Sequence, residues 1–525
     1  MGQIIGISVV VVLVAWALHD IIQKKHAILR NFPIVGHFRY WLEAIGPELR
    51  QYIVTSNNEE RPFSRDQRRW VYASSKNENN YFGFGTDEDL ESSPHYLILK
   101  QAGFPVHDPL KGEPTYDDDF NIPCAKILGQ HRNRKHAFRP KSIVNLSGMS
   151  FGSLSGPAIE ALNGGAKLAN FLHNTGEGGI TPYHQQGGDL LWQIGTGYFG
   201  CRTDQGRFDL KKFQDKIQQN PVKAIEIKLS QGAKPGMGGL LPAAKITAEV
   251  AEIRGIPMGV DCASPSAHPE FHDVDSMLDF VERLADATGL PVGIKSAVGE
   301  TTFWTDLAML MSTTNRGVDF VSVDGGEGGT GAAPLVFADH VSLPFKLGFS
   351  RVYREFVEYD MHDKIVFNGA GKLGFPESGL FAMALGCDTI SIAREAMLAI
   401  GCIQAQRCHT GHCPAGVATQ NRWLQRGLDP TLKSVRVANY IITLRKEMLR
   451  LTRACGQEHP SLITLEHFDI LQENLRSEPA TKVFEHWADW GLPSAEDQEA
   501  IRSIMRSPVA EREALIQSHG ALVQS

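Results

Sequence analysis

The stretch FVSVDGGEGGTG at residues 320–331 joins a short apolar run, typical of a buried strand, to a loop rich in glycine and polar residues. From about residue 142 onward the same order recurs along the chain, with helical segments between the units. The clearest helix is Val274–Thr288, whose apolar residues recur at helical spacing. The runs that we interpret as strands are Ile143–Leu146, Ala169–Leu172, Ala224–Leu229, Met258–Cys262, Pro291–Lys295, Phe320–Val323, Ile365–Phe367 and Thr389–Ile392.

Alternation of strands and helices predicts a parallel sheet, and eight such units over about 250 residues predict a (β/α)8 TIM barrel of the α/β class. An open, doubly wound sheet is the alternative. One further apolar run, Leu190–Ile194, exceeds the eight, and we assign it to an insertion between the second and third strands.

The composition is that of a globular protein, with 42% hydrophobic and 21% charged residues in 525. Because the formal net charge is −7 and no long basic run occurs, we expect no nucleic-acid partner. A chain of this size with eight cysteines is not a small disulfide scaffold, so the three cysteines clustered within residues 402–413 indicate a metal site.

The N-terminus contains an uncharged, mostly apolar run, Ile4–Leu18, which reaches the length of a membrane span when Met1–Ile22 is counted. The nearby positive charges all follow it: Lys24, Lys25, Arg30 and Arg39. This bias predicts a single-pass membrane protein whose catalytic body is cytoplasmic. A cleaved signal peptide is the alternative, since Ala15-Trp16-Ala17 resembles a cleavage site, but no positive residue precedes the run.

We expect four regions. Residues 1–25 form the transmembrane anchor, and residues 26–141 form an irregular N-terminal region that packs on the barrel. Residues 142–420 form the barrel with its cysteine loop, and residues 421–525 form a helical C-terminal extension. In the extension we expect helices at Lys433–Arg453 and Ser494–Gln517, the second broken at Pro508.

Polar side chains and glycines follow the predicted strands, where barrel enzymes carry their sites. Lys228, Gln231 and Lys234 have the spacing K-x-x-Q-x-x-K, and two ammonium groups with an amide could hold a dicarboxylate. Surface lysines are the alternative. Lys228 and Lys295 end apolar strands, however, so each faces the barrel mouth or is buried at considerable cost. Lys295 could lie against a flavin and stabilise its reduced anion.

The segment Gly369-Ala-Gly371-Lys-Leu-Gly374 matches the pattern GxGxxG, which alone is a weak signal. It comes too late in the chain for the start of a Rossmann domain. We interpret it as a barrel phosphate site, in which the loops after the last two strands bind phosphate through backbone N–H groups. Simple turn glycines remain the other interpretation.

The sharpest local signal is Cys402-x5-Cys408-x4-Cys413-Pro414. Three thiolates at this spacing can hold one iron–sulfur cluster. The alternatives are zinc, with His409 or His412 as a fourth ligand, and structural thiols; the spacing matches neither common zinc pattern.

Several motifs together resemble the FMN-binding synthase domain of glutamate synthase, in order and over about residues 142–420. They are SGMSFGSLS (147–155), NTGEGG (174–179), IKLSQGAKPG (227–236), GGEGGTG (325–331) and the run from Gly401 to Gln420 that holds the three cysteines.

The resemblance implies FMN at the barrel mouth and a 3Fe-4S cluster on Cys402, Cys408 and Cys413. It implies an oxidoreductase acting on CH–NH2 donors, in which electrons pass from a donor to the cluster and then to FMN, and a hydride passes to 2-iminoglutarate formed from 2-oxoglutarate and ammonia. The catalytic residues carried over are Glu177, Lys228, Gln231, Lys234 and Lys295. The cofactor-binding residues carried over are Met149, Ser150, Asn174, Thr175, Lys295, Gly325, Gly326, Gly369, Gly371, Ala393 and Arg394.

The chain also departs from that family. We find neither an N-terminal glutaminase domain nor an NAD(P)H-binding domain, so we expect externally supplied ammonia or amine and an electron donor protein, either a ferredoxin or an NAD(P)H reductase. Where the family has Ser-Gly-Arg-Phe, this chain has Thr196-Gly-Tyr198-Phe199, which puts the keto acid itself in doubt. The alternatives are an N-alkyl-glutamate synthase subunit that uses an amine, and a non-catalytic FMN/iron–sulfur electron-transfer subunit. An FMN isomerase would have no use for the cluster.

Overall fold

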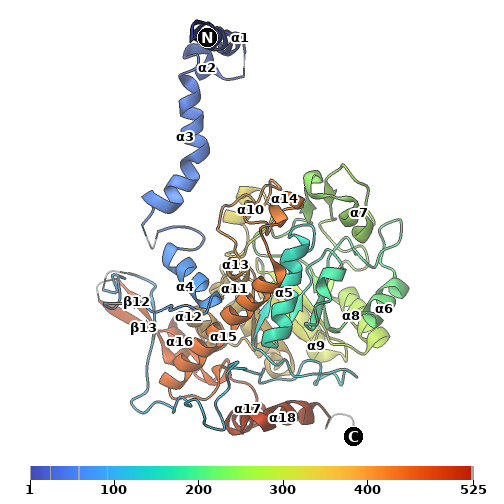
Figure 1. The fold of residues 1–525 in the computed structure, drawn as a ribbon. Helices are drawn as coiled ribbons and strands as arrows, with labels where there is room; N and C mark the ends of the chain where they lie inside the picture. Colours follow the sequence, from blue (N-terminus) through green and yellow to red (C-terminus); the bar gives the residue numbers. More distant parts are fainter. Residues whose placement is uncertain (1, 24, 57–58, 92, 474, 522–525) are drawn as a thin grey trace. The chain divides into compact units, whose positions relative to one another are not determined.

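The computed structural model describes residues 2–23, 25–56, 59–91, 93–473 and 475–521, which form two compact units, Met1–Trp70 and Val71–Ser525 (Figure 1). Of the residues used above for the N-terminal anchor, Met1 and Lys24 lie outside this description.

The first unit is helical: α1 (Gly2–Ile22), α2 (Ala27–Asn31), α3 (Gly36–Leu49), the short π-helix η1 (Arg50–Val54) and the start of α4 (Arg65–Ser75). Helix α1 has a mean hydropathy of 2.3 over its most apolar 18 residues and is long enough to cross a membrane. Length and composition of this kind suit a membrane anchor and a signal sequence alike. Near its end Asp20 accepts a hydrogen bond from the Ile34 N–H at 2.8 Å, which folds the chain back after the helix.

The second unit is built on a closed barrel of eight parallel strands, which confirms the predicted (β/α)8 fold. Around the barrel the strand order is β10-β11-β2-β3-β4-β5-β8-β9. Their bounds are β2 Val144–Leu146, β3 His173–Asn174, β4 Leu190–Ile194, β5 Val222–Lys228, β8 Val292–Ala297, β9 Phe320–Asp324, β10 Val366–Ala370 and β11 Thr389–Ile392.

Two strand predictions were wrong, and they exchange places. Leu190–Ile194 is barrel strand β4, paired with β3 and β5, whereas Met258–Cys262 is no barrel strand. Met258 and Val260 are more than half exposed, because this segment belongs to an insertion between β5 and β8. A short apolar run does not by itself report burial. The predicted strand Ala169–Leu172 lies just before the observed strand β3 (His173–Asn174) and does not overlap it, since α5 continues to Ala169.

The insertion consists of β6 (Leu240–Leu241), η3 (Ala243–Lys245), α7 (Ala248–Arg254) and β7 (Cys262–Ala263), with β6 and β7 paired antiparallel. The other helices between barrel strands are α5 Gly156–Ala169, η2 Pro182–His184, α6 Leu210–Gln218, α8 Val274–Thr288, α9 Thr302–Thr313, α10 Leu335–His340, α11 Phe345–Glu358, η4 His362–Lys364 and α12 Pro376–Ala384. Helix α8 has the predicted bounds.

After β11 come α13 (Arg394–Ala399), α14 (Arg422–Gln425) and α15 (Pro430–Ala454). Helix α15 packs along α5, and the two lie side by side in Figure 1. The approach requires glycine, since a Cβ on Gly165 would lie 2.1 Å from a methyl carbon of Val437. The C-terminal extension is thereby fixed to the barrel.

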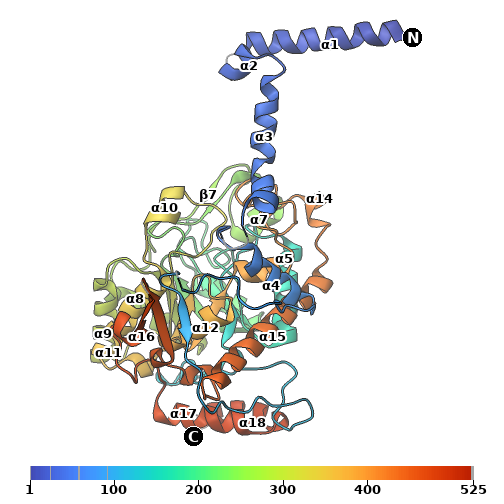
Figure 2. The same cartoon turned by 90° about the vertical axis from the view of Figure 1, so that its left-hand side faces the viewer.

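The extension is not purely helical, contrary to the prediction. Strands β12 (Phe468–Gln472) and β13 (Arg476–Pro479) form an antiparallel sheet with β1 (Leu97–Leu99). The remaining elements are η5 Pro460–Leu462, η6 Leu465–His467, α16 Ala480–Val483, α17 Ala495–Arg506 and α18 Val509–Ala521; the predicted break at Pro508 is confirmed. In both views of this unit α7, α10 and α14 lie at one end, and α17 and α18 lie at the other (Figure 1, Figure 2).

Candidate functional site

A hollow of about 1,290 Å³, including space open to solvent, lies at the carboxyl ends of the barrel strands. Its wall includes residues in the last half of six strands or directly after them: Ser147, Lys228, Lys295, Asp324, Ala370 and Ser391. The insertion contributes Leu240, Leu241 and Arg254. This is where barrel enzymes hold their substrates, and we call it the mouth hollow.

An ion pair occupies one side of the mouth hollow. The Lys228 ammonium, at the end of β5, lies 3.1 Å from a carboxylate oxygen of Glu177, and both side chains are nearly buried. Burial alone would raise the pKa of Glu177, but Lys228, with Lys234 and Arg254 beyond it, lowers that pKa below its ordinary value. Glu177 is therefore a carboxylate near neutral pH, and Lys228 faces the hollow as predicted.

Two further cations line the same side. Lys234 is 5% exposed, and burial, then repulsion from Lys228, lowers its pKa. Arg254 of α7 is equally buried; its Nη2 donates to the Phe151 carbonyl at 3.0 Å, while its Nε has no hydrogen-bond partner among the described residues. Gln231 also lines this wall. Three cations and one carboxylate leave an excess of positive charge that suits an anionic ligand.

Lys295 lies deeper in the barrel, at 6% exposure. Its ammonium donates to the Ser147 hydroxyl at 3.0 Å and lies 3.4 Å from Asp324, which in turn accepts from the Gly232 N–H. The charge of Lys295 is thus matched by a carboxylate, and its position between β2, β8 and β9 is fixed.

Glycine loops form another part of the wall. Gly371 follows β10 with φ of +128°, a conformation that favours glycine, and a Cβ there would lie 3.2 Å from the Gly325 backbone. Gly328, Gly329 and Gly331 also line the hollow. The Arg394 side chain crosses this loop and donates to the Glu327 carbonyl.

The structure brings ten of the predicted catalytic and cofactor residues to the mouth hollow: Glu177, Lys228, Gln231, Lys234, Lys295, Met149, Ser150, Gly371, Ala393 and Arg394. Five others are not among the residues that line it: Asn174, Thr175, Gly325, Gly326 and Gly369. Asn174 is buried and hydrogen-bonded to Glu226 inside the barrel. Sequence reasoning missed Arg254. This residue ends α7, in the insertion whose segment Met258–Cys262 was misread as a barrel strand.

Of the three clustered cysteines, Cys408 lines the mouth hollow and Cys413 is buried beside it. Burial and the neighbouring Cys413 raise the pKa of Cys408, and Lys245 faces both thiols. The backbone carbonyl of Cys402 accepts from the Tyr72 hydroxyl at 2.8 Å. Over the described part of the chain, no three His, Cys, Asp or Glu side chains are gathered closely enough for a single metal ion.

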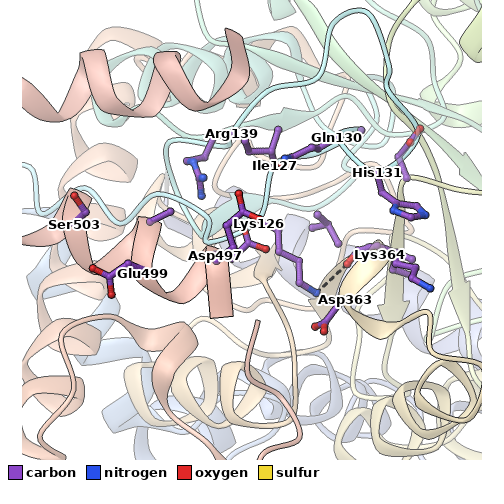
Figure 3. Close-up of a pocket in the computed structure, with 16 residues that line it drawn as sticks. Lys126, Ile127, Gln130, His131, Arg139, Asp363, Lys364, Asp497, Glu499 and Ser503 are labelled. Atoms are coloured by element: carbon purple, nitrogen blue, oxygen red, sulfur yellow. Dashed lines mark hydrogen bonds between the residues drawn. The ribbon is translucent and has the colours of Figure 1, made fainter. Parts of the chain in front are cut away.

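A second hollow of about 1,880 Å³, again counting open space, lies at the amino ends of β9 and β10 (Figure 3). Its two buried cations, Lys126 and Arg139, already have partners. Lys126 donates to the His362 and Ile365 carbonyls and lies 3.2 Å from Asp388, and Arg139 donates to the Cys124 and Ala125 carbonyls. These contacts hold the segment before the barrel against the barrel base, so we assign this hollow a structural role.

Known proteins resemble the chain along most of its length. Residues 117–458 match the family described as a conserved region in glutamate synthase. A glutamate synthase large subunit-like protein, YerD, of Bacillus subtilis is 38% identical over 90% of this chain and 95% of its own length. The chain belongs to the glutamate synthase family.

More distant members match in part. The archaeal glutamate synthase [NADPH] of Methanocaldococcus jannaschii is 34% identical over 60% of this chain and 59% of its own length. A solved structure of mandelate oxidase with (S)-4-hydroxymandelic acid matches with a TM-score of 0.42 and 14% identity, over 72% of this chain and 88% of that chain; this likeness is too weak to bear on function. The relatives support an oxidoreductase of the glutamate synthase type.

Tyr198, where the family resemblance led us to expect arginine, is fully buried and is not among the residues lining the mouth hollow. Its hydroxyl lies 3.0 Å from Nδ1 of His268, whose Nε2 lies 2.9 Å from the Lys228 carbonyl. Burial lowers the pKa of His268 to about 4, so the ring is neutral near pH 7. Because the carbonyl only accepts, Nε2 carries the proton and Nδ1 accepts from Tyr198. Tyr198 therefore supports the backbone beneath Lys228.

We expect dicarboxylate binding at the mouth hollow to weaken as pH rises, and at a lower pH than an ordinary lysine would cause. The lowered pKa of Lys234 means that its ammonium is lost earlier as pH increases. Titration of the oxidised holoprotein with 2-oxoglutarate over a range of pH measures this. Lys234→Arg keeps the cation and should flatten the dependence, whereas Lys234→Met should weaken binding by about 10-fold or more. Unchanged affinity of Lys234→Met for 2-oxoglutarate would contradict a role of Lys234 in binding the dicarboxylate.

Proposed function

We propose that this protein is an FMN-dependent oxidoreductase that reduces the imine of a keto acid, 2-oxoglutarate or a close relative, to the corresponding amine. The observation that carries the proposal is the arrangement of the mouth hollow. Lys228, Lys234 and Arg254 form a cationic wall, and the glycine loops after β9 and β10 line the same hollow. Family membership supplies the reaction class.

The residues at the mouth fit FMN. Gly371 and the glycines of residues 328–331 leave a cradle without side chains, where backbone N–H groups suit a phosphate. Met149, Ser150, Ala393 and Arg394 border it, and Lys295 stands between the two sides. When bound, FMN would supply the hydride. The Lys295 ammonium, held by Ser147 and Asp324, would then favour negative charge on the neighbouring ring.

The cationic wall would orient the keto acid. Lys234 and Arg254 offer a buried ammonium and a buried guanidinium for carboxylates, and Gln231 offers an amide. Lys228 stands next to Glu177 and can donate to the oxo group or imine. Glu177 stays ionised because of its cationic neighbours, so it balances the charge of the wall and holds Lys228 in place. Ammonia or an amine would enter from outside.

We further propose that Cys402, Cys408 and Cys413 hold a 3Fe-4S cluster that receives electrons from a donor protein. The donor chemistry fits, with three thiols in one loop and the Lys245 ammonium facing two of them. A multi-iron cluster is larger than a single ion, so its thiolates stand further apart than the ligands of one ion. Cys408 is both a proposed ligand and part of the mouth wall, which puts the cysteine loop beside the FMN cradle.

The reaction is tested with the flavin-loaded protein, reduced chemically in the absence of oxygen and mixed with 2-oxoglutarate and ammonia. We expect rapid return of the oxidised flavin spectrum and formation of glutamate. The same reaction with methylamine in place of ammonia separates an N-alkyl-glutamate synthase from a glutamate synthase. If no keto acid and amine pair reoxidises the flavin, the protein is an electron-transfer subunit and the proposal fails.

The cluster assignment predicts that Cys408→Ser lowers the iron and acid-labile sulfide content of the purified protein. The matched control is Cys455→Ser, a buried thiol at the end of α15, outside the cysteine loop. The control should keep full iron and sulfide content, because only the three clustered thiols are ligands. Equal content in both variants would refute the assignment.

We propose that α1 anchors the protein to a membrane with the catalytic body on the cytoplasmic side. Its hydropathy and the positive residues that follow support this. Removing residues 1–25 should move the protein from the membrane fraction to the soluble fraction with its flavin retained. A body that still sediments with membranes, or a mature wild-type protein that lacks these residues, would contradict the anchor.

A further inference from the structure

The segment that follows the cysteine loop carries two exposed cations, Arg422 and Arg426, and two half-buried ones, Lys433 and Arg436. Between residues 414 and 436 the sequence has four arginine or lysine residues and one acidic residue, on a chain with 59 acidic and 52 basic residues. Over the described residues, Arg422, Arg426, Lys433 and Arg436 form no ion pair. Many exposed cations elsewhere do, such as Lys211 with Asp215 and Lys482 with Glu478.

The single acid of this segment does not neutralise the surface. Asp429 accepts hydrogen bonds from the Thr431 and Leu432 N–H groups and caps α15. Although Asp429 attracts Lys433, one carboxylate against four cations leaves this surface with a net positive charge. We call Arg422, Trp423, Arg426, Lys433 and Arg436 the basic surface.

An aromatic ring stands within the basic surface. Trp423 is 69% exposed, and the Arg426 guanidinium lies 3.6 Å from the centre of its ring. Leu432 and Val435, on the first turns of α15, are also exposed. Exposed tryptophan and arginine beside apolar side chains are typical of protein interfaces.

The basic surface is joined to the cysteine loop by direct contacts. Gln425 of α14 donates to the Thr419 carbonyl at 3.0 Å, and the Thr419 hydroxyl donates to the carbonyl of Gly411, between Cys408 and Cys413. The Lys433 ammonium lies 3.0 Å from where a Cβ on Gly401, next to Cys402, would stand. Cys408 in turn lines the mouth hollow. The surface, the cysteines and the hollow thus form one continuous route.

We propose that the basic surface docks a small acidic one-electron carrier protein, whose electrons enter at the cysteine loop. This rests on the proposed function and names the chemistry of its donor. The carrier is oxidised by one electron at each encounter. Two reduced carriers and two protons from solvent are therefore consumed for each C=N bond reduced to CH–NH. Positive charge around the entry point would steer an acidic partner to the cysteines and leave basic carriers unbound.

The test measures binding of a purified, acidic plant-type [2Fe–2S] ferredoxin to the full-length holoprotein by calorimetry. The variant Arg422→Glu with Arg426→Glu should weaken binding by about 10-fold or more, because like charges then face the carrier. Wild-type binding should also weaken with added salt above about 0.1 M, where screening shortens the reach of charges to ~10 Å.

The matched control is Lys135→Glu with Arg351→Glu, which changes the net charge equally. Both residues are exposed and unpaired within the described residues, one on the loop before β2 and one on α11. The control should bind ferredoxin as the wild type does. Flavin content, iron content and melting temperature of both variants establish that each is folded; if the glutamate pair unfolds, Arg422→Gln with Arg426→Gln replaces it.

Electron delivery separates this inference from the proposed function. The variant reduced by dithionite should reoxidise with keto acid and amine at the wild-type rate, while its reduction by ferredoxin should be slow. Equal loss of ferredoxin binding in the variant and the control, or no binding by the wild type, would overturn the docking proposal. The proposal would also fail if the Arg422 and Arg426 variant bound ferredoxin as the wild type does but lost binding to anionic phospholipid vesicles. That result would assign the surface to a membrane.

Discussion

The buried carboxylate of Glu226 holds the catalytic end of the barrel together. It is 1% exposed on β5 and accepts hydrogen bonds from Asn174 on β3, Gln193 on β4 and Ser322 on β9. A buried charge is tolerated only when it is fully hydrogen-bonded, and here three strands provide the donors. The network therefore constrains the relative positions of four strands just below the mouth hollow. Through the Ser322 hydroxyl it continues to Asn368 on β10, which accepts from Thr389 and Ser391 on β11.

The loops that form the site start from this layer. The Asn174 side chain that donates to Glu226 also accepts from the Gly176 N–H, which turns the chain toward Glu177. Lys228 is two residues beyond Glu226 on the same strand, so it points into the same side of the barrel one layer higher. The hydrogen bonds of Glu226 and Asn174 inside the barrel thus bring Glu177 and Lys228 together as an ion pair. Asn174 therefore supports the site from below, whatever contact it makes with a cofactor.

Much of this arrangement could be predicted from the sequence because strand ends of a barrel converge on one face. The runs IEIK and VGIK each place a lysine after an apolar strand, and both lysines line the mouth hollow. Helix α8 was predicted with its observed bounds because its apolar residues have helical spacing and Gly289 ends it. The sequence could not decide which of Leu190–Ile194 and Met258–Cys262 is a barrel strand, because both are short apolar runs and their neighbours in space are unknown. Arg254 was missed because AEVAEIR (residues 248–254) is typical of a surface helix. Only the fold of the insertion buries its last residue.

The distribution of charge in the mouth hollow accounts for the division of roles between its two sides. Lys295 has its own carboxylate in Asp324, so that pair adds no net charge to its part of the hollow. On the other side Glu177 offsets only one of Lys228, Lys234 and Arg254. Burial and repulsion from Lys228 both lower the pKa of Lys234, so the excess of buried cations is unfavourable. A ligand with two carboxylates would relieve that repulsion, whereas a neutral substrate would not. The proposed preference for a dianionic keto acid thus rests on the charge of the mouth hollow itself.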